Sequence, residues 1–268
     1  MANRLNGKSA VVIGAASGMG RATAIAYLKE GANVVAADIH EGRLEELAAE
    51  VAELGLSKQF TYTVCNVVNS EDCANVLEVC GKTFGTCNVL TSTVGILDNF
   101  SRVGDIDDAV WDRCLAVNCT GVMHVLRAGI RYFLAHEIPA SVVIVTSDAV
   151  GQQATGAASY SASKCGASGL ISAAAFEYSF QGIRFNQICP GKIGDTKLIE
   201  SVASYGGIDQ AGRECHVSRG YNAHKAEWVT KDCGTSMDIA NVAVFLASDE
   251  SDFVNNQRIM VNGGLNLG

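Results

Sequence analysis

The chain has 268 residues, 48% of them hydrophobic and 18% charged, and it contains 28 glycines but only 2 prolines. Such a composition predicts an ordered globular protein and excludes a disordered chain. The net charge of −8, with no cluster of lysines and arginines, argues against a nucleic-acid-binding surface. The first apolar run, SAVVIG at 9–14, is too short for a signal peptide or a membrane span, so we expect a cytoplasmic protein that does not contact membranes.

Seven short runs rich in β-branched residues predict strands, in chain order. They lie at 9–14, 32–38, 59–67, 88–95, 141–147, 183–189 and 257–263. Between them, segments such as 42–55 repeat apolar residues at intervals of three and four, which indicates amphipathic helices. This alternation predicts an α/β fold with a doubly wound, mostly parallel seven-stranded sheet and helices on both faces. No linker divides the chain, so residues 1–268 are expected to form a single domain.

The segment between Cys189 and Ser236 departs from this rhythm. We interpret 192–234 as a substrate-binding lid within the domain, because long segments with a weak pattern usually serve such a role. Its apolar side chains, which favour a bulky and mostly neutral alcohol or ketone, are Leu198, Ile199, Val202, Tyr205, Tyr221 and Trp228. His216 and His224 stand outside any ligand cluster and are interpreted as ordinary loop residues.

The ten cysteines show no metal-ligand spacing. They stand at 65, 73, 80, 87, 114, 119, 165, 189, 215 and 233, without one Cys-x-x-Cys. This pattern predicts reduced structural thiols and no metal site.

A glycine-rich turn follows the first predicted strand. The stretch GAASGMG places Gly14, Gly18 and Gly20 where a strand meets a helix. Backbone N–H groups of such a turn, together with the helix N-terminus, can bind a pyrophosphate, as in a Rossmann fold. A purely structural strand-to-helix turn is the alternative interpretation.

An acidic residue ends the second predicted strand. Asp38 lies eighteen residues after Gly20, where a carboxylate can accept hydrogen bonds from both hydroxyls of an adenosine ribose and repel a 2′-phosphate. The position therefore predicts NAD as the cofactor rather than NADP. A role in capping the helix that begins near Glu41 is the alternative, and the two roles are compatible.

A phenol and an ammonium lie one helical turn apart at Tyr160 and Lys164. A neighbouring ammonium favours the phenolate, so we expect Lys164 to lower the pKa of Tyr160 and make it a general acid or base. Ser147, at the end of the fifth predicted strand, can hydrogen-bond the same substrate oxygen. Taken alone, the Tyr-x-x-x-Lys pattern also fits a solvated helix face.

Together, GAASGMG, Asp38, Ser147, Tyr160 and Lys164 resemble the classical short-chain dehydrogenase/reductase family. The resemblance extends to LAVNCTGV around Asn118, to NQICPG at 186–191 and to the C-terminal stretch. It implies that Tyr160 transfers the proton at the substrate oxygen, Lys164 binds the nicotinamide ribose, Ser147 polarises the carbonyl and Asn118 holds a water.

The resemblance also implies a cofactor-binding set. Its members are Gly14, Ser17, Gly18, Met19, Gly20, Asp38, Asn66, Val67, Thr93, Gly95, Tyr160, Lys164, Pro190, Gly191, Ile193 and Thr196. The chain departs from the family pattern at several of these positions. Ser92, Thr93 and Val94 replace two asparagines and an alanine, so the usual asparagine cross-link between strands must be replaced. Ile13 stands for a threonine, Asn66 for an aspartate, and Thr196 comes one residue late.

Within the resemblance, we expect an NAD-dependent oxidoreductase that interconverts a secondary alcohol and a ketone, with a hydroxysteroid or bile acid as substrate. A polyol or sugar-alcohol dehydrogenase is the alternative, followed by a non-catalytic NAD-binding protein and a sugar-nucleotide epimerase. The small residues of 156–175 allow close helix packing, and the resemblance implies a homotetramer built on this helix and the one through Asn118. Packing of the same helix on the sheet is compatible with that assembly.

Overall fold

The computed structural model describes residues 3–151, 157–216 and 233–264. Its centre is one seven-stranded sheet of order β3-β2-β1-β4-β5-β6-β7. The strands are β1 (Ser9–Ile13), β2 (Asn33–Asp38), β3 (Phe60–Val64), β4 (Val89–Ser92), β5 (Ala140–Val145), β6 (Ile183–Pro190) and β7 (Arg258–Val261). All seven predicted strands are confirmed, and every pairing between them is parallel.

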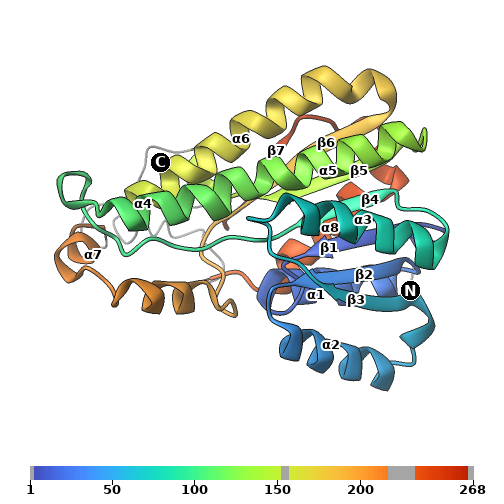
Figure 1. Ribbon diagram of the computed structural model, residues 1–268, viewed down its shortest axis with the longest axis horizontal. Coiled ribbons are helices and arrows are strands. Elements are labelled where there is room, and N and C mark those ends of the chain that lie inside the picture. Colours follow the sequence, from blue (N-terminus) through green and yellow to red (C-terminus); the bar gives the residue numbers. More distant parts are fainter. Residues whose placement is uncertain (1–2, 152–156, 217–232, 265–268) are drawn as a thin grey trace.

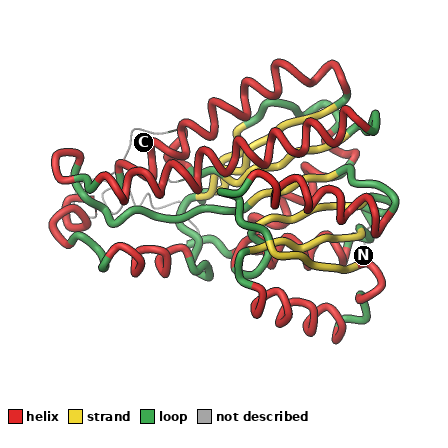
Figure 2. The backbone as a smooth tube through the Cα atoms, in the orientation of Figure 1, coloured by secondary structure: helices red, strands yellow, loops and turns green. Residues whose placement is uncertain are grey.

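Helices cover both faces of the sheet, as the alternating sequence predicts (Figures 1 and 2). One layer contains α1 (Gly18–Lys29), α2 (Glu41–Glu53) and α8 (Ser236–Ala247). The other contains α3 (Ser70–Phe84), α5 (Gly121–Ala135) and α6 (Ala158–Tyr178). Two shorter helices, α4 (Asp108–Leu115) and α7 (Gln210–His216), lie beyond the sheet on the left of Figure 1. The arrangement is that of a Rossmann fold.

The buried strands divide their side chains between two apolar clusters. In β1, Val11 and Ile13 pack in the cluster with α3, α5 and α6, whereas Ala10 and Val12 pack in the cluster with α1, α2 and α8. Successive side chains of a strand point to opposite faces, so an unbroken apolar run serves both layers. This explains why the strand sequences show no polar alternation.

The order of the strands reverses between β1 and β4. The chain leaves β1 toward β2 and β3 and then returns to β4 on the other side, with Ile13 paired to Ser92. Parallel strands direct their carboxyl ends to one edge, and a reversal of this kind opens a crevice there. The glycine-rich turn, Ser147 and the segment after β6 all lie at that edge.

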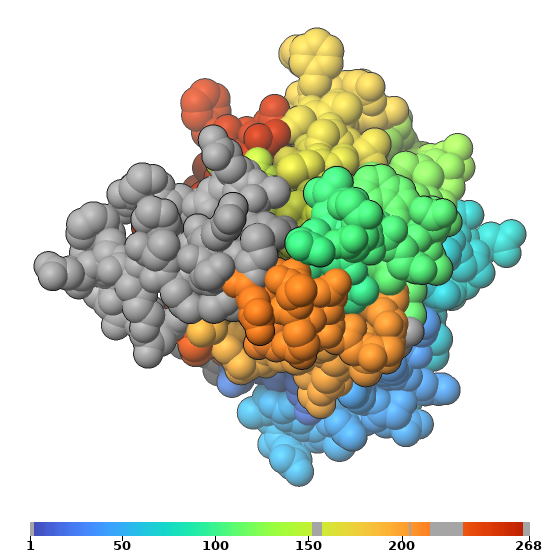
Figure 3. Space-filling view, turned by 90° about the vertical axis from the view of Figure 1, so that its left-hand side faces the viewer, coloured from blue at the N-terminus to red at the C-terminus, as the bar shows by residue number. Residues whose placement is uncertain are grey.

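The described part of the predicted lid is docked against the segment that follows β4. It contains the 3-10 helix η6 (Leu198–Tyr205) and α7. The N–H of Leu97 donates to Ser201 Oγ at 2.9 Å, and the N–H of Asp209 donates to the Asn99 carbonyl at 2.8 Å. Figure 3 shows this part of the chain beside the region of α4. The described residues do not include 217–232 of the predicted lid, where Tyr221, His224 and Trp228 stand. The side chain of His216 also lies outside them.

The nine cysteines whose side chains are described are free thiols, and six of them are buried. Among the described residues, no group of three His, Cys, Asp or Glu side chains could hold a metal ion. None of the described helices has the length and apolarity needed to cross a membrane.

Candidate active site

The turn between β1 and α1 leaves room for a phosphate group against bare backbone. Gly14 and Gly18 have φ of +87° and +50°, a region that favours glycine. A Cβ at Gly20 would lie 2.0 Å from the Gly14 carbonyl oxygen, so only glycine fits there. Ser17 precedes α1 without capping it through its side chain, which leaves the first-turn N–H groups without a side-chain acceptor. These N–H groups and the positive end of the helix fit a pyrophosphate.

Asp38 lies beside this turn and has two backbone partners. Its Oδ2 accepts the N–H of Ala16 at 3.0 Å, and its Oδ1 accepts the N–H of His40 at 3.1 Å. The second contact fixes the entry to α2, because His40 directly precedes that helix, but Asp38 accepts no N–H of the helix itself, so the capping role considered for it is not what the structure shows. Each carboxylate oxygen has a further lone pair, so the residue retains acceptors for ribose hydroxyls.

Thr93 replaces the cross-link that the family's asparagine usually provides. Its N–H donates to the Ile13 carbonyl at 2.9 Å, and its hydroxyl lies 3.3 Å and 3.2 Å from the carbonyl oxygens of Ile13 and Gly14. A short side chain thus joins the end of β4 to the glycine-rich turn. The departure from the family pattern therefore leaves the connection between these two segments in place.

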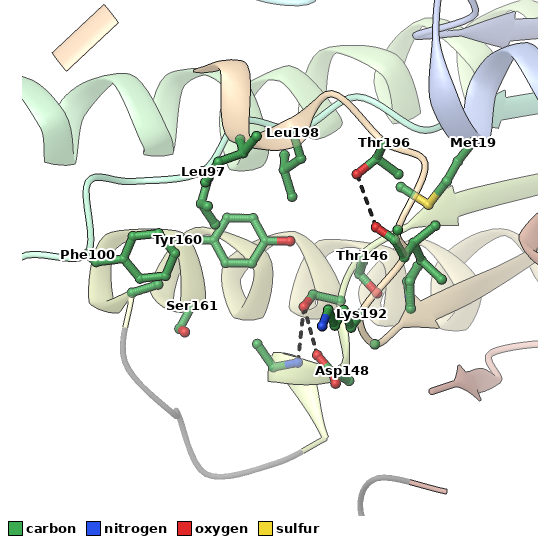
Figure 4. A pocket seen from close by; sticks show the side chains of 18 of the residues that line it. Met19, Leu97, Phe100, Thr146, Asp148, Tyr160, Ser161, Lys192, Thr196 and Leu198 are labelled. Carbon is green, nitrogen blue, oxygen red and sulfur yellow. Dashed lines mark hydrogen bonds between the residues drawn. The ribbon is translucent and has the colours of Figure 1, made fainter. Parts of the chain in front are cut away.

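The other predicted cofactor residues form two groups along the same edge. Asn66 and Val67 follow β3, where Asn66 Oδ1 accepts the N–H of Val68 at 3.1 Å. Pro190, Gly191, Ile193 and Thr196 follow β6, and the nearest atom to a Cβ at Gly18 would be the Cα of Thr196, at 3.4 Å. Figure 4 shows Thr196 next to Met19. Thr196 therefore covers the glycine-rich turn despite its shift by one residue.

A cavity of about 550 Å³ opens beside these segments. Its lining includes Met19, Leu97, Phe100, Ser147, Tyr160, Pro190, Gly191, Ile193, Thr196, Leu198 and Ile199. In Figure 4 the hydroxyl of Tyr160 points into the cavity, between Leu198 and Asp148. The structure thus brings Ser147 and Tyr160 together with several predicted cofactor residues and with Leu198 and Ile199, two of the apolar side chains predicted for the lid.

Ser147 is held by its neighbours at the start of a short 3-10 helix. Its Oγ accepts the N–H of Ala149 at 3.2 Å and donates to Asp148 Oδ1 at 3.3 Å. The side chain is 6% exposed, and that exposed part faces the cavity. The hydroxyl can turn from Asp148 to another acceptor, because rotation about the C–O bond is free.

Lys164 is buried behind Tyr160. Its Nζ lies 5.8 Å from the centre of the Tyr160 ring and donates to the carbonyls of Val94 and Val145 at 3.4 Å and 3.3 Å. A Cβ at Gly95 would approach Nζ to 2.9 Å, so the glycine leaves room for the ammonium. Burial lowers the pKa of Lys164 to about 8.

The expected lowering of the Tyr160 pKa is wrong for the protein alone. Burial raises the pKa of Tyr160 to about 12, the neighbouring hydroxyl of Ser147 opposes the rise, and the carboxylates of Asp148 and Asp98 add to it. The reason is that both members of the pair are desolvated, which disfavours the charged form of each. Geometry places the ammonium near the phenol, but the protein by itself holds the phenol in its neutral form.

Asn118 is fully buried in a π-helical turn (Ala116–Thr120) that joins α4 to α5. Its Nδ2 donates to the Ile96 carbonyl at 2.9 Å and to Ser163 Oγ at 3.0 Å, and its Oδ1 accepts the Ile96 N–H at 2.8 Å. Its carboxamide therefore fixes the segment after β4 against α6. The role of water ligand stays a prediction.

Several residues of the cavity were not singled out from the sequence, among them Asp148, Phe100 and Arg213. Asp148 directly follows Ser147, and that position was a usable signal. Phe100 stands in an irregular segment and Arg213 in the weakly patterned lid, so nothing in the sequence distinguishes them from other loop residues.

Known proteins resemble this chain over its whole length. A family model described as enoyl-(acyl carrier protein) reductase matches residues 14–266. A 3β-hydroxysteroid dehydrogenase of Eggerthella lenta is 34% identical over 97% of this chain and 95% of its own. A 3-oxoacyl-[acyl-carrier-protein] reductase of Thermotoga maritima is 32% identical over 98% of this chain and 99% of its own. The crystal structure of levodione reductase superimposes with a TM-score of 0.84 at 25% identity, covering 97% of this chain and 98% of its own.

The close approach at Gly20 gives a test of the phosphate site. We expect Gly20→Ala to weaken NADH binding at least about tenfold, because the new methyl group must displace the Gly14 carbonyl from the turn. Fluorescence titration with NADH measures this. Gly42→Ala is the matched control, since no atom lies within 4 Å of its added Cβ. Equal affinity of the two variants would contradict the site.

Proposed function

Because the chain belongs to the classical short-chain dehydrogenase/reductase family, and is therefore an oxidoreductase that uses NAD or NADP, we propose that it interconverts a secondary alcohol and a ketone with NAD. The observation that carries this proposal is the convergence of Ser147 and Tyr160 at one cavity beside the glycine-rich turn, with the ammonium of Lys164 buried behind the Tyr160 ring. The fit of that turn to a pyrophosphate and of Asp38 to a ribose supports the dinucleotide.

Each catalytic side chain has a defined task in this mechanism. In the direction of oxidation, Tyr160 accepts the proton of the substrate hydroxyl while Ser147 donates a hydrogen bond to the same oxygen. In the direction of reduction, Tyr160 returns that proton. Lys164 has three N–H donors, of which two are directed at the carbonyls of Val94 and Val145. The third is available to the nicotinamide ribose, and the positive charge favours the phenolate. Bound NAD supplies the acceptor for the hydride that leaves the substrate carbon.

Tyr160→Phe tests the mechanism. We expect kcat to fall at least about 100-fold, since the phenol is the only proposed proton carrier at the substrate oxygen, while NADH binding is retained. In the wild type, kcat for oxidation should rise with pH, because the phenolate is the base, and kcat for reduction should fall. Steady-state kinetics over a pH series measures both. Undiminished turnover by the variant would exclude Tyr160 as the proton carrier.

Asp38 tests the choice of cofactor. The carboxylate lies where it would repel a 2′-phosphate, so Asp38→Arg should shift the ratio of kcat/KM with NADH to that with NADPH about 10- to 100-fold toward NADPH. Glu45→Arg, an exposed position on α2, controls for the general change in charge. An unchanged ratio in Asp38→Arg would contradict the assignment of NAD.

The cavity supports a bulky apolar substrate, and we propose a hydroxysteroid or a bile acid. Leu97, Phe100, Leu198 and Ile199 contribute apolar walls. Arg213 also lines the cavity and forms no ion pair with any described residue, so its charge is available to an anionic group of the substrate. This combination favours a bile acid over a polyol, which would place many hydroxyl groups against apolar walls.

A substrate panel followed by NADH absorbance decides between these classes. We expect turnover of neutral hydroxysteroids or bile acids, and we expect Arg213→Gln to raise KM about tenfold for bile acids while leaving KM for neutral hydroxysteroids unchanged. Turnover of polyols alone would instead identify a polyol dehydrogenase. Binding of NADH without turnover of any alcohol or ketone would favour a non-catalytic NAD-binding protein.

We also propose that the protein is a homotetramer built on α5 and α6. Large apolar side chains stand exposed on these helices and just after them, including Phe176 at 83% and Phe180 at 96%. Light scattering should give about four times the chain mass of 28.1 kDa, and Phe176→Ser with Phe180→Ser should lower it. A monomer mass for the wild type would contradict the assembly.

A further inference from the structure

A buried carboxylate from a distant segment lies at the start of the helix that carries the proposed catalytic pair. Asp98 stands in the irregular segment after β4 and is only 1% exposed. Its Oδ2 accepts the backbone N–H of Tyr160 at 3.0 Å, and its Oδ1 accepts the N–H of Phe100 at 3.0 Å. The carboxylate thus contacts the backbone of the proposed proton carrier itself.

The contact takes the place of a helix cap that α6 lacks. Ala157 precedes the helix and has no side chain that could accept a hydrogen bond. An N-cap residue normally accepts the N–H of the second or third helical residue. Tyr160 is the third residue of α6, and its acceptor comes from Asp98, 62 positions earlier in the chain. A negative charge at a helix N-terminus is also favoured by the helix dipole.

The start of α6 depends on such an external anchor. Ala157 has φ of +51° and ψ of +62°, a left-handed conformation that is strained for alanine. Without the Asp98 contact, the first turn would be free to relax toward ordinary backbone angles. Because Tyr160 lies in that turn, the position of its phenol follows the position of the cap.

The same segment forms part of the cavity wall. Leu97 and Phe100 line the cavity on either side of Asp98 in the sequence. The Leu97 N–H donates to Ser201 of η6, and the Phe100 carbonyl packs so closely on Gly212 of α7 that a Cβ there would lie 1.9 Å from its oxygen. Asp98 therefore connects the substrate-facing wall with the proposed catalytic helix.

We propose that Asp98 is a positioning residue, which caps α6 from outside the helix and thereby holds Tyr160 in register with Ser147 and the cavity. The inference rests on the proposed function, because it assigns Asp98 a role through Tyr160. The role of Asp98 differs from a simple structural role in two ways. The hydrogen bond of the carboxylate sets the position of the Tyr160 phenol, and its charge acts on the pKa of that phenol.

The charge of Asp98 acts among several groups around Tyr160. Lys164 lies on the same helix, Asp148 follows β5, Cys114 approaches from α4 and Arg213 lines the cavity from α7. Besides burial, which is the largest cause, the carboxylates of Asp148 and Asp98 and the thiol of Cys114 raise the pKa of Tyr160. Removal of the charge of Asp98 therefore lowers the pKa of the phenol.

Two substitutions separate geometry from charge. Asp98→Ala removes the cap, so we expect kcat to fall about 10- to 100-fold, with the NADH Kd unchanged within about twofold. Asp98→Asn keeps one acceptor oxygen without the charge. It should recover at least half of the lost activity on a logarithmic scale and move the Tyr160-dependent limb of kcat for oxidation to lower pH. Asp105→Asn, an exposed aspartate that pairs with Arg102, is the matched control and should change neither quantity.

The kinetics of the Asp98 and Tyr160 variants distinguish failure of the positioning role from failure of the proposed function. Unchanged kcat in Asp98→Ala would overturn the positioning role, even if Tyr160→Phe is inactive and the proposed function stands. Parallel losses of kcat and NADH affinity would also overturn it, because they indicate general damage to the site. If Asp98→Ala does not fold, Asp98→Asn decides, and a pH profile equal to that of the wild type overturns the inference. Full activity of Tyr160→Phe would remove the proposed function and this inference together.

Discussion

The carboxamide of Asn118 joins the segments on which the site depends. It holds both backbone groups of Ile96 and the hydroxyl of Ser163, so the end of β4, the turn between α4 and α5, and helix α6 meet at one buried side chain. Asn118 lies in a π-helical turn, an irregularity that is frequent at functional sites. The positions of Gly95, Lys164 and Tyr160 relative to one another follow from this junction.

Burial then sets the electrostatic character of the site. Lys164 and Tyr160 are removed from water without a compensating opposite charge, so the protein raises the pKa of the phenol and lowers that of the amine. A group that brings positive charge next to the phenol therefore lowers the pKa of Tyr160 strongly, because little solvent remains to screen that charge.

Much of the fold could be predicted from the sequence because strands and helices have local signals. The runs at 9–14 and 141–147 have unbroken apolar centres of Val and Ile, which matches strands covered on both faces. The glycine-rich turn and the Tyr160–Lys164 pair were also recognisable, since each is a short pattern with a chemical reason. The structure brings Ser147 and Tyr160 to one cavity and Lys164 behind Tyr160, while Asn118 holds Ser163 of the same helix and does not line the cavity.

Other parts of the site depend on contacts that no local pattern reveals. The cap on α6 comes from Asp98 in an irregular segment, and the partner of Thr93 is a turn about 80 residues earlier. The pKa of Tyr160 was predicted in the wrong direction because spacing shows which charges are near but not how much water is removed. Arg213 belongs to a segment without periodicity, so only folding brings it to the cavity.

The two backbone contacts of Asp38 have a consequence for the evolution of this enzyme. The carboxylate holds the glycine-rich turn through Ala16 and the entry to α2 through His40. A substitution of Asp38 by a residue without an acceptor at this point removes both of these contacts at once. The N–H groups of Ala16 and His40 would then each need a new acceptor, so the identity of this one residue is tied to the local structure of two separate segments.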